Sequence, residues 1–213
     1  GRVRGIPPVC CRANDASCLP PAASVRALVH RFLLVVVLLG FAGCATEPPQ
    51  RPWVPQVDNE LRAMGYRNWV VVADASFPVH SRRGVRTIIV DDEIPAVLDE
   101  VLQSLDRVQN VTPRIYLSRE LGHVPNDRAP GVNHYRETLD QALRGFPTRE
   151  MEYRWLSLML EDNSNKFVVL VLKTKTALPY SSVFIELDSA YWDGESEREL
   201  RERMESERLK TST

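Results

Sequence analysis

A short apolar run bounded by chain-breaking residues constrains the fold of this chain more than any other stretch. Trp-Val-Val-Val-Ala at 69–73 is rich in β-branched residues, and its length suits a strand rather than a helix. It lacks the polar alternation of a half-exposed strand, so we expect it to be covered on both faces. Gly65 precedes it and Pro78 follows it, and both residue types interrupt regular structure. Asp74 therefore comes where a buried strand leaves the core, at the sheet edge where open α/β sheets bind ligands.

The rest of the chain alternates apolar strand patterns with helical ones. Pro95 opens a segment whose apolar residues recur at helical spacing, which is typical of an amphipathic helix on a core. Another helix is expected to end near Met64. Further strands are expected over 87–90, 114–117, 167–172 and 183–187, and further helices over 131–143 and 148–160. This alternation predicts a layered α/β domain, although the pattern alone does not fix the strand order.

Composition excludes several classes of protein and of site. The 213 residues, 44% of them hydrophobic, suffice for one sizeable globular domain with extensions. The formal net charge is −1, so the chain lacks the excess of positive charge that nucleic-acid-binding proteins carry, and no nucleic-acid partner is expected. The four cysteines are Cys10, Cys11, Cys18 and Cys44, so the chain beyond Cys44 holds neither a disulfide nor a thiolate metal site.

Residues 1–43 have the composition of an extension followed by an export signal. A Pro- and Arg-rich stretch without periodicity leads to an apolar run at 32–42, which is flanked by basic residues and too short to span a bilayer. Phe41-Ala42-Gly43-Cys44 resembles a bacterial lipobox, in which lipid is attached to the cysteine, although Phe41 stands where leucine is usual. We expect lipidation of Cys44, with a plain apolar anchor as the alternative. Ala45 after the cysteine then implies the periplasmic side of the outer membrane.

The segments beyond Cys44 complete the expected organisation. Residues 44–55 contain four prolines and would form a semi-rigid tether. The predicted domain covers residues 56–190, and 191–213 form a charged tail rich in Glu and Arg. Glutamates and arginines four residues apart in this tail predict a solvated helix with ion pairs along its surface. A contact between subunits is the alternative role for the tail.

Several short motifs occur one after another through residues 56–190. They are Met64-Gly65, Asp74-Ala75, Phe77-Pro78, His80-Ser81, Leu105-Asp106, Val132 with Tyr135-Arg136, and Pro179-Tyr180. In this order they resemble the D-ribose pyranase and L-fucose mutarotase family, nearest to its fucose mutarotase branch. Motifs spread over a whole domain are harder to obtain by chance than one short pattern. The resemblance implies a mixed, mostly parallel β-sheet between helices, a ring of identical subunits, a free monosaccharide as ligand and no cofactor.

The resemblance also implies a chemistry and a set of site residues. Members of the family interconvert cyclic forms of monosaccharides, which requires one proton to reach the ring oxygen and another to leave the anomeric hydroxyl. Asp74 and Tyr180 match the family's catalytic positions. Tyr66 occupies its histidine position and Ser182 its asparagine position, and both are expected to bind substrate. The phenol of Tyr66 is a weaker base than imidazole at neutral pH. The hydroxyl of Ser182 lacks the paired hydrogen-bond donor and acceptor of an amide.

Two histidines are further candidates for the site. His80 follows Asp74 on the same loop and could assist proton transfer, with a hydrogen bond that braces the loop as the alternative. His134 lies beside Tyr135 on an expected helix and could contact substrate, with a solvated or capping role as the alternative. Asp74 itself could be a turn or capping aspartate. No metal site is expected.

Two functions therefore stay open at this point. The first is an exported isomerase that resembles sugar mutarotases and pyranases and uses Asp74, Tyr180 and His80. The second is a catalytically inactive carbohydrate-binding or structural lipoprotein of the cell envelope. Tyr66 and Ser182 favour the second, and so does export, because the family's known members serve sugar uptake in the cytoplasm.

Overall fold

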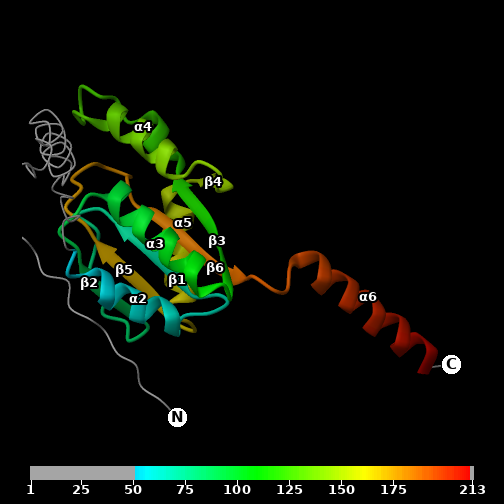
Figure 1. Ribbon diagram of the computed structural model, residues 1–213. Coiled ribbons are helices and arrows are strands. Elements are labelled where there is room, and N and C mark those ends of the chain that lie inside the picture. The colour runs from blue at the N-terminus through cyan, green and yellow to red at the C-terminus, as the bar shows by residue number, and fades with distance from the viewer. Residues whose placement is uncertain (1–50, 212–213) are drawn as a thin grey trace, which may run out of the picture. The chain divides into compact units, whose positions relative to one another are not determined.

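The computed structural model describes residues 51–211, and a six-stranded sheet in the order β2-β5-β1-β6-β3-β4 forms their centre (Figure 1). The strands are β1 (Trp69–Ala73), β2 (Val85–Ile89), β3 (Val111–Ser118), β4 (Thr148–Met151), β5 (Val169–Lys173) and β6 (Val183–Ser189). β5 pairs in parallel with β1 and β2, and β3 pairs in parallel with β4. β6 runs antiparallel to β1 and β3. The predicted fold class, an α/β layered domain with a mixed, mostly parallel sheet, is confirmed.

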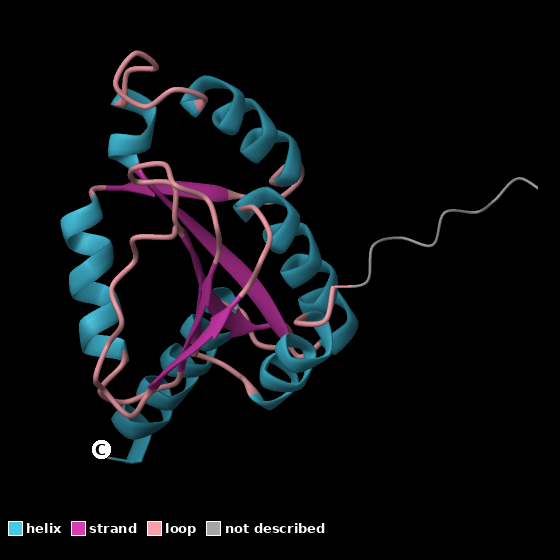
Figure 2. Ribbon diagram, turned by 90° about the vertical axis from the view of Figure 1, so that its left-hand side faces the viewer, coloured by secondary structure: helices cyan, strands magenta, loops and turns pink. Residues whose placement is uncertain are grey.

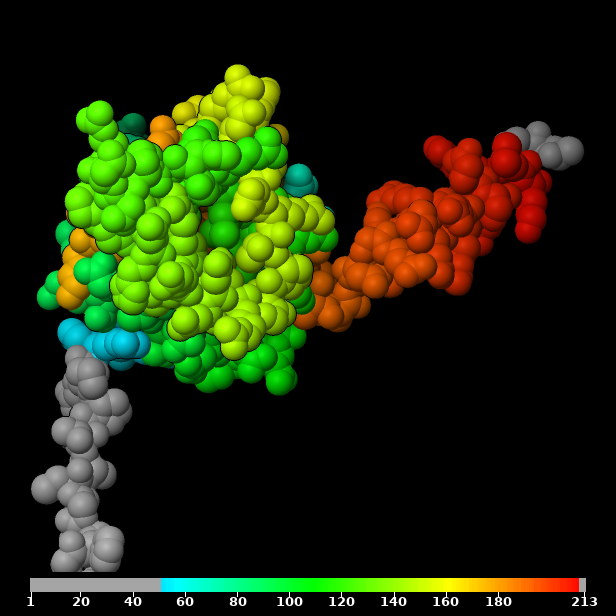
Figure 3. Space-filling view, turned by 90° about the horizontal axis from the view of Figure 1, so that it is seen from above, coloured from blue at the N-terminus to red at the C-terminus, as the bar shows by residue number. Residues whose placement is uncertain are grey.

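Helices cover both faces of this sheet (Figure 2). The covering helices are α2 (Val54–Ala63), α3 (Ile94–Val108), α4 (Val132–Ala142) and α5 (Tyr153–Asn163), with the 3₁₀ turn η1 (Arg119–His123). The last helix, α6 (Gly194–Thr211), extends away from the sheet and contributes to neither core cluster (Figure 1). Apolar residues of α2, α3 and α4 join one core cluster, and those of α5 join a second. Seen from above, the light green and yellow segments between β3 and α5 make up most of the visible face of the domain (Figure 3). The predicted export signal and the lipidation site at Cys44 lie outside the described residues.

β1 is the strand that the two clusters share. All five of its residues are buried. Val70 and Val72 point into the cluster with α2, α3 and α4, whereas Trp69, Val71 and Ala73 point into the cluster with α5. Because successive side chains of a strand alternate between faces, this division requires a strand covered on both sides. The expectation drawn from the apolar run at 69–73 is confirmed.

One predicted element is wrong at its start. Residues 148–151 were expected to begin a helix, but they form the edge strand β4, and α5 begins only at Tyr153. Both carboxylate oxygens of Glu120 accept the backbone N–H of Tyr153 at 3.0 Å. The first N–H groups of a helix need such acceptors, and this one comes from 33 residues earlier in the chain. No local pattern marks that start.

The charged tail forms α6, whose residues from Arg198 to Lys210 are all exposed. Two of the ion pairs expected from its spacing are present, between Glu197 and Arg201 at 2.6 Å and between Glu199 and Arg203 at 3.5 Å. Surface pairs of this kind each contribute only about 0.3–0.5 kcal/mol. In the part of the chain that the structure describes, no helix has the length and apolar character needed to cross a membrane.

Candidate functional site

Asp74 follows β1 at the edge of the sheet where the loops after β1 and β5 meet. The N–H of Ser76 donates to its Oδ1 at 2.8 Å, which closes a tight turn. The hydroxyl of Ser182 donates to its Oδ2 at 2.7 Å and accepts the N–H of Asp74 at 3.0 Å. Ser182 can do this because the antiparallel register sets Val72 opposite Val183. The Asp74 carboxylate is therefore held in one orientation by groups from two segments of the chain.

The Asp74 carboxylate lines a hollow of about 490 Å³, which we call the Asp74 hollow. This size lies within the range of small-molecule sites, roughly 300–1,000 Å³. Tyr180, from the loop before β6, lines the same hollow. The remaining lining comes from Ser76, Phe77, Pro78, Tyr153, Ala177, Leu178 and Pro179. Asp74 and Tyr180 therefore line one space whose remaining lining is largely apolar.

Tyr180 has an unusual backbone conformation. Its φ angle is +59°, in the left-handed region that residues with a side chain rarely adopt. Its ring meets the ring of Tyr153 edge to face, with the centroids 5.7 Å apart, and 42% of the residue is exposed. A conformation of this kind costs about 1–3 kcal/mol and persists where surrounding structure enforces it, which is common at binding sites. Tyr180 thus combines a strained backbone with a partly exposed side chain at the wall of the hollow.

A buried hydrogen-bond network supports the loop that carries Tyr180. The hydroxyl of Tyr135, on α4, donates to the carbonyl of Ser181 at 2.6 Å. Burial raises the pKa of Tyr135 above its ordinary range, and the nearby carboxylates of Asp74 and Glu93 raise it further. Tyr135 therefore remains a neutral donor, and it fixes the loop from beneath.

Thr176 ties the same loop to the start of α3. Its hydroxyl accepts the N–H of Ile94 at 2.9 Å and donates to Glu93, and its carbonyl accepts the N–H of Ala75 at 2.9 Å. Thr176 thus joins the loop after β5 to both the helix start and the turn after Asp74. The floor of the site is rigid because each of these buried polar groups has a partner.

The structure brings together three of the six predicted site residues and separates the others. Asp74 and Tyr180 line one hollow, and Ser182 lies directly behind Asp74 with 2% of its surface exposed. Because Ser182 is turned to Asp74 and buried, it supports the carboxylate and does not face the open space. Tyr66 precedes β1, whereas Asp74 follows it, so the five residues of the strand lie between them. At roughly 3.3 Å per residue the strand itself spans about 17 Å, so the two positions lie at opposite ends of β1 within one chain.

The two histidines are not part of the lining of the Asp74 hollow, although His80 contacts Phe77, which is. His80 is half-buried against Phe77, with ring centroids 5.9 Å apart. Its Nε2 is buried and has no hydrogen-bond partner within residues 51–211, so it braces no loop through that atom. His134 is exposed on α4, and its carbonyl accepts the hydroxyl of Thr138. Neither ring is among the groups that line the hollow.

Sequence reasoning assigned no role to two tyrosines that belong to this site. Tyr153 begins α5 and contacts Tyr180, but its neighbours in the chain carry no signal of a site. Tyr135 is part of the Tyr135-Arg136 motif, and that motif was the one signal that could have identified it.

A second hollow of about 530 Å³ lies on the other side of Tyr180. It shares Pro179 and Tyr180 with the Asp74 hollow and adds Glu120 and His123 from η1. Burial acts to raise the pKa of Glu120, but hydrogen bonds from the Ser118 hydroxyl and from backbone N–H groups outweigh it and lower that pKa. Glu120 is therefore an ionised group that caps the start of α5. This structural role is sufficient to explain its position, and no catalytic role is needed.

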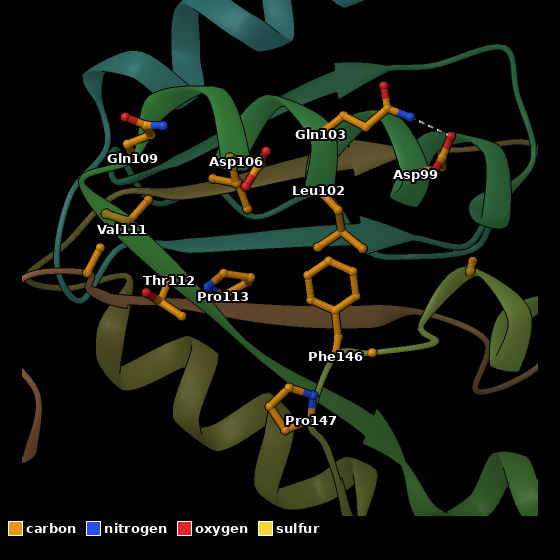
Figure 4. Close-up of a pocket in the computed structure, with 14 residues that line it drawn as sticks. Asp99, Leu102, Gln103, Asp106, Gln109, Val111, Thr112, Pro113, Phe146 and Pro147 are labelled. Carbon is orange, nitrogen blue, oxygen red and sulfur yellow. Dashed lines mark hydrogen bonds between the residues drawn. The ribbon is translucent and has the colours of Figure 1, made fainter.

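A third hollow, of about 690 Å³, lies between α3, β3 and the connection from α4 to β4. In Figure 4 the ring of Phe146 faces Leu102, with Pro113 beside them, and Gln103 donates to Asp99 at 2.9 Å on the rim. The hollow contains carboxylates and amides but no pair of groups arranged for proton transfer among the residues described. Within residues 51–211 there is also no group of three His, Cys, Asp or Glu side chains that could hold a metal ion.

Comparisons with known proteins give matches at the level of structure alone. No protein-family model matches this chain, and no curated protein does. The structure of Bacillus subtilis RbsD complexed with D-ribose matches with a TM-score of 0.44 and 14% identity, over 62% of this chain and 91% of that one. The fucose mutarotase from Streptococcus pneumoniae, in complex with L-fucose, matches with a TM-score of 0.41 and 22% identity, over 63% and 91%.

A third solved structure belongs to the same group. FucU from Bifidobacterium longum matches with a TM-score of 0.42 and 18% identity, over 63% of this chain and 94% of that one. These proteins are of the kind that the sequence motifs resemble, and the similarity concerns the arrangement of helices and strands.

Proposed function

We propose that this protein binds a free monosaccharide in the Asp74 hollow and interconverts its anomeric or ring forms by acid–base catalysis. The observation that carries the proposal is that Asp74 and Tyr180, which are 106 positions apart in the sequence, line one hollow of about 490 Å³. Both are positions that the motif resemblance selects. Their chemical natures also differ in the way that opening a hemiacetal requires, because one is a proton acceptor and the other a proton donor.

In the proposed reaction the two groups act on the anomeric centre together. The Asp74 carboxylate accepts the proton of the anomeric hydroxyl while the Tyr180 phenol donates its proton to the ring oxygen. The bond between the anomeric carbon and the ring oxygen breaks, and its electron pair stays on that oxygen. The open-chain aldehyde turns and closes on its other face, and both protons return. A positioned acid or base of this kind is typically worth about 10² to 10⁴ in rate.

The surroundings of Asp74 suit the task of a fixed base. Ser76 and Ser182 each occupy one hydrogen-bonding position on a carboxylate oxygen, and each oxygen has a second lone pair for substrate. Tyr153 and Phe77 provide apolar surface on which the C–H face of a sugar ring can pack. The absence of His80 from the lining leaves Asp74 as the proposed base.

The test is exchange spectroscopy by NMR on the full chain with D-ribose and L-fucose. We expect exchange between anomers to exceed the uncatalysed rate, and Asp74→Asn to lower the excess by about 10² or more. Tyr180→Phe removes the proton donor and should have an effect of similar size. The matched control is Asp99→Asn, which makes the same chemical change at another hollow and should leave exchange within about twofold of the unmodified chain.

A binding-only role is the second candidate, and one observation favours it. Both carboxylate oxygens of Asp74 already accept a hydrogen bond within the chain, an arrangement that also suits a purely structural aspartate. In that case saturation-transfer NMR would detect bound sugar while exchange stayed at the uncatalysed rate. No bound sugar and no exchange would refute both candidates.

The cellular setting is part of the proposal. The lipobox-like Phe41-Ala42-Gly43-Cys44 supports export and lipid attachment at Cys44, on the periplasmic side of the outer membrane. Intact-mass spectrometry of protein isolated from the membrane fraction tests this. We expect the mass of a chain that begins at Cys44 plus lipid, and loss of the lipid mass in Cys44→Ser.

Assembly into a ring of identical subunits is also proposed, on the strength of the motif resemblance alone. Light scattering on the purified chain measures it directly. A strictly monomeric chain that still exchanges anomers would show that the ring is not needed for function.

A further inference from the structure

A hollow at the opposite end of β1 from Asp74 carries three exposed aromatic rings. It has a volume of about 540 Å³ and is lined by Tyr66, by residues of β3 and β6, by the segment after β6 and by the first turns of α6. We call it the Tyr66 hollow. Tyr66 is 62% exposed, Tyr191 83% and Trp192 44%. Single exposed aromatic rings are ordinary, but a group of three around one hollow is characteristic of a binding surface.

The charges around this hollow are predominantly negative. Four carboxylates line it, those of Glu186, Asp188, Asp193 and Glu197, against the two guanidinium groups of Arg114 and Arg201. Both cations are already engaged, because Arg114 forms an ion pair with Asp188 and Arg201 with Glu197. The hollow therefore holds two negative charges in excess of its positive ones.

The aromatic and acidic groups are linked to each other. The indole N–H of Trp192 donates to the carboxylate of Glu197 at 2.9 Å, which fixes the orientation of the indole ring. This hydrogen bond, followed by the one from Arg201, lowers the pKa of Glu197 below its usual range. Hydrogen bonds from Ser196 lower the pKa of Asp193 in the same way. Both carboxylates are therefore ionised at neutral pH.

We propose that the Tyr66 hollow binds an organic ammonium ion, a positively charged nitrogen that carries methyl or methylene groups. The faces of aromatic rings carry negative electrostatic potential and attract such cations, and Trp provides the strongest of these contacts. The two excess carboxylates add attraction of the same sign. An anion would be repelled, and a neutral sugar could pack on the rings but would gain nothing from the net charge. The proposal is independent of the sugar function assigned to the Asp74 hollow.

The probe is choline, and the readout is the fluorescence of Trp192. The full chain contains four tryptophans, of which Trp53 and Trp69 are buried and Trp155 is 49% exposed on α5. Trp155→Phe therefore gives a background in which Trp192 is the exposed tryptophan of the described residues. Choline is titrated into this variant at constant ionic strength. The comparison ligand is 3,3-dimethyl-1-butanol, which has the same shape but an uncharged carbon in place of the nitrogen.

We expect a saturable change with choline, at an affinity at least about tenfold higher than that of the neutral isostere. Glu186→Gln and Tyr191→Ala should each weaken choline binding several-fold, the first by removing charge and the second by removing an aromatic face. Asp74→Asn is the matched control for a carboxylate at the other hollow, and choline should bind it unchanged. Conversely, Glu186→Gln should leave anomer exchange unchanged, so that failure at one site is distinguishable from failure at the other.

Three outcomes would overturn the proposal. The first is the absence of a saturable change, and the second is equal affinity for choline and its isostere, which would show an apolar surface without selectivity for charge. The third is choline binding that survives both Glu186→Gln and Tyr191→Ala. Because Tyr191 is largely exposed, its replacement carries little risk to folding, which circular dichroism verifies.

Discussion

Replacing Ser182 with alanine tests the claim that Asp74 is held in place by a buried hydroxyl. The Ser182 hydroxyl donates to the Asp74 carboxylate at 2.7 Å and accepts its backbone N–H at 3.0 Å, with 2% of the residue exposed. A hydrogen bond to a charged group contributes about 1.5–3 kcal/mol, and a buried N–H left without a partner costs about 1–3 kcal/mol. Asp74 is only half-buried, so water replaces part of the first contribution. We expect Ser182→Ala to lower the free energy of unfolding by about 3 kcal/mol.

The assay is urea-induced unfolding, followed by the fluorescence of the buried Trp53 and Trp69. The matched control is Ser189→Ala, at the other end of β6, where the hydroxyl oxygen is buried but has no hydrogen-bond partner among the described residues. That replacement removes an unsatisfied polar atom and should therefore leave stability unchanged or raise it. A double-mutant cycle with Asp74→Ala isolates the side-chain contact. Equal losses in the two serine variants would refute the network.

Three further predictions concern other supports of the fold. Tyr135→Phe leaves the carbonyl of Ser181 unpaired and should cost about 1–3 kcal/mol in urea unfolding. Because burial raises the pKa of Tyr135 in the folded state, its contribution is complete below the ordinary tyrosine pKa and declines above it. The unmodified chain should therefore lose up to about 1.4 kcal/mol per pH unit more than Tyr135→Phe above roughly pH 10. Gly84→Ala should lower the melting temperature markedly, since its Cβ would lie 2.5 Å from the carbonyl oxygen of Ser164, and Gly65→Ala, which meets no atom, is its control. Glu120→Gln removes the negative charge at the start of α5 and should lower the free energy of unfolding by about 1 kcal/mol at neutral pH. Since the pKa of Glu120 is lowered in the folded state, that difference should disappear as the pH falls through it, and a difference that grew with acid would contradict the capping role.

The sequence predicted most reliably the features that depend on burial. The run at 69–73 identified a doubly covered strand and set Asp74 at its end, because alternating burial leaves a pattern in local sequence. The apolar spacing after Pro95 identified α3 for the same reason. Features that depend on partners distant in the chain were missed. The start of α5 is the example, because it depends on Glu120, 33 residues earlier in the chain. The start of α3 was predicted although the hydroxyl of Thr176 also supports it, because Pro95 marks it in the local sequence.

The candidate site shows the same division. Asp74 and Tyr180 were predicted from motifs, and they line one hollow. Ser182 was expected to contact substrate, but the register of β6 against β1 turns its hydroxyl to Asp74. Tyr66 lies at the other end of the strand because the whole of β1, five extended residues, stands between it and Asp74. A motif can identify a candidate site residue, but the direction and register of the strands determine which candidates lie close together in the fold.

The position of β6 has a consequence for how the protein is made. Of the strands in residues 51–211, β6 is synthesised last, yet it lies in the middle of the sheet and joins β1 to β3. β1 and β2 do not pair with each other, and both pair with β5, which is also synthesised late. The apolar strand at 69–73 must therefore wait about 100 residues for its first neighbour, an interval in which exposed strands are prone to aggregation. A nascent chain that stalls before residue 183 would hold two half-sheets with nothing to unite them, and would depend on chaperones until translation resumed.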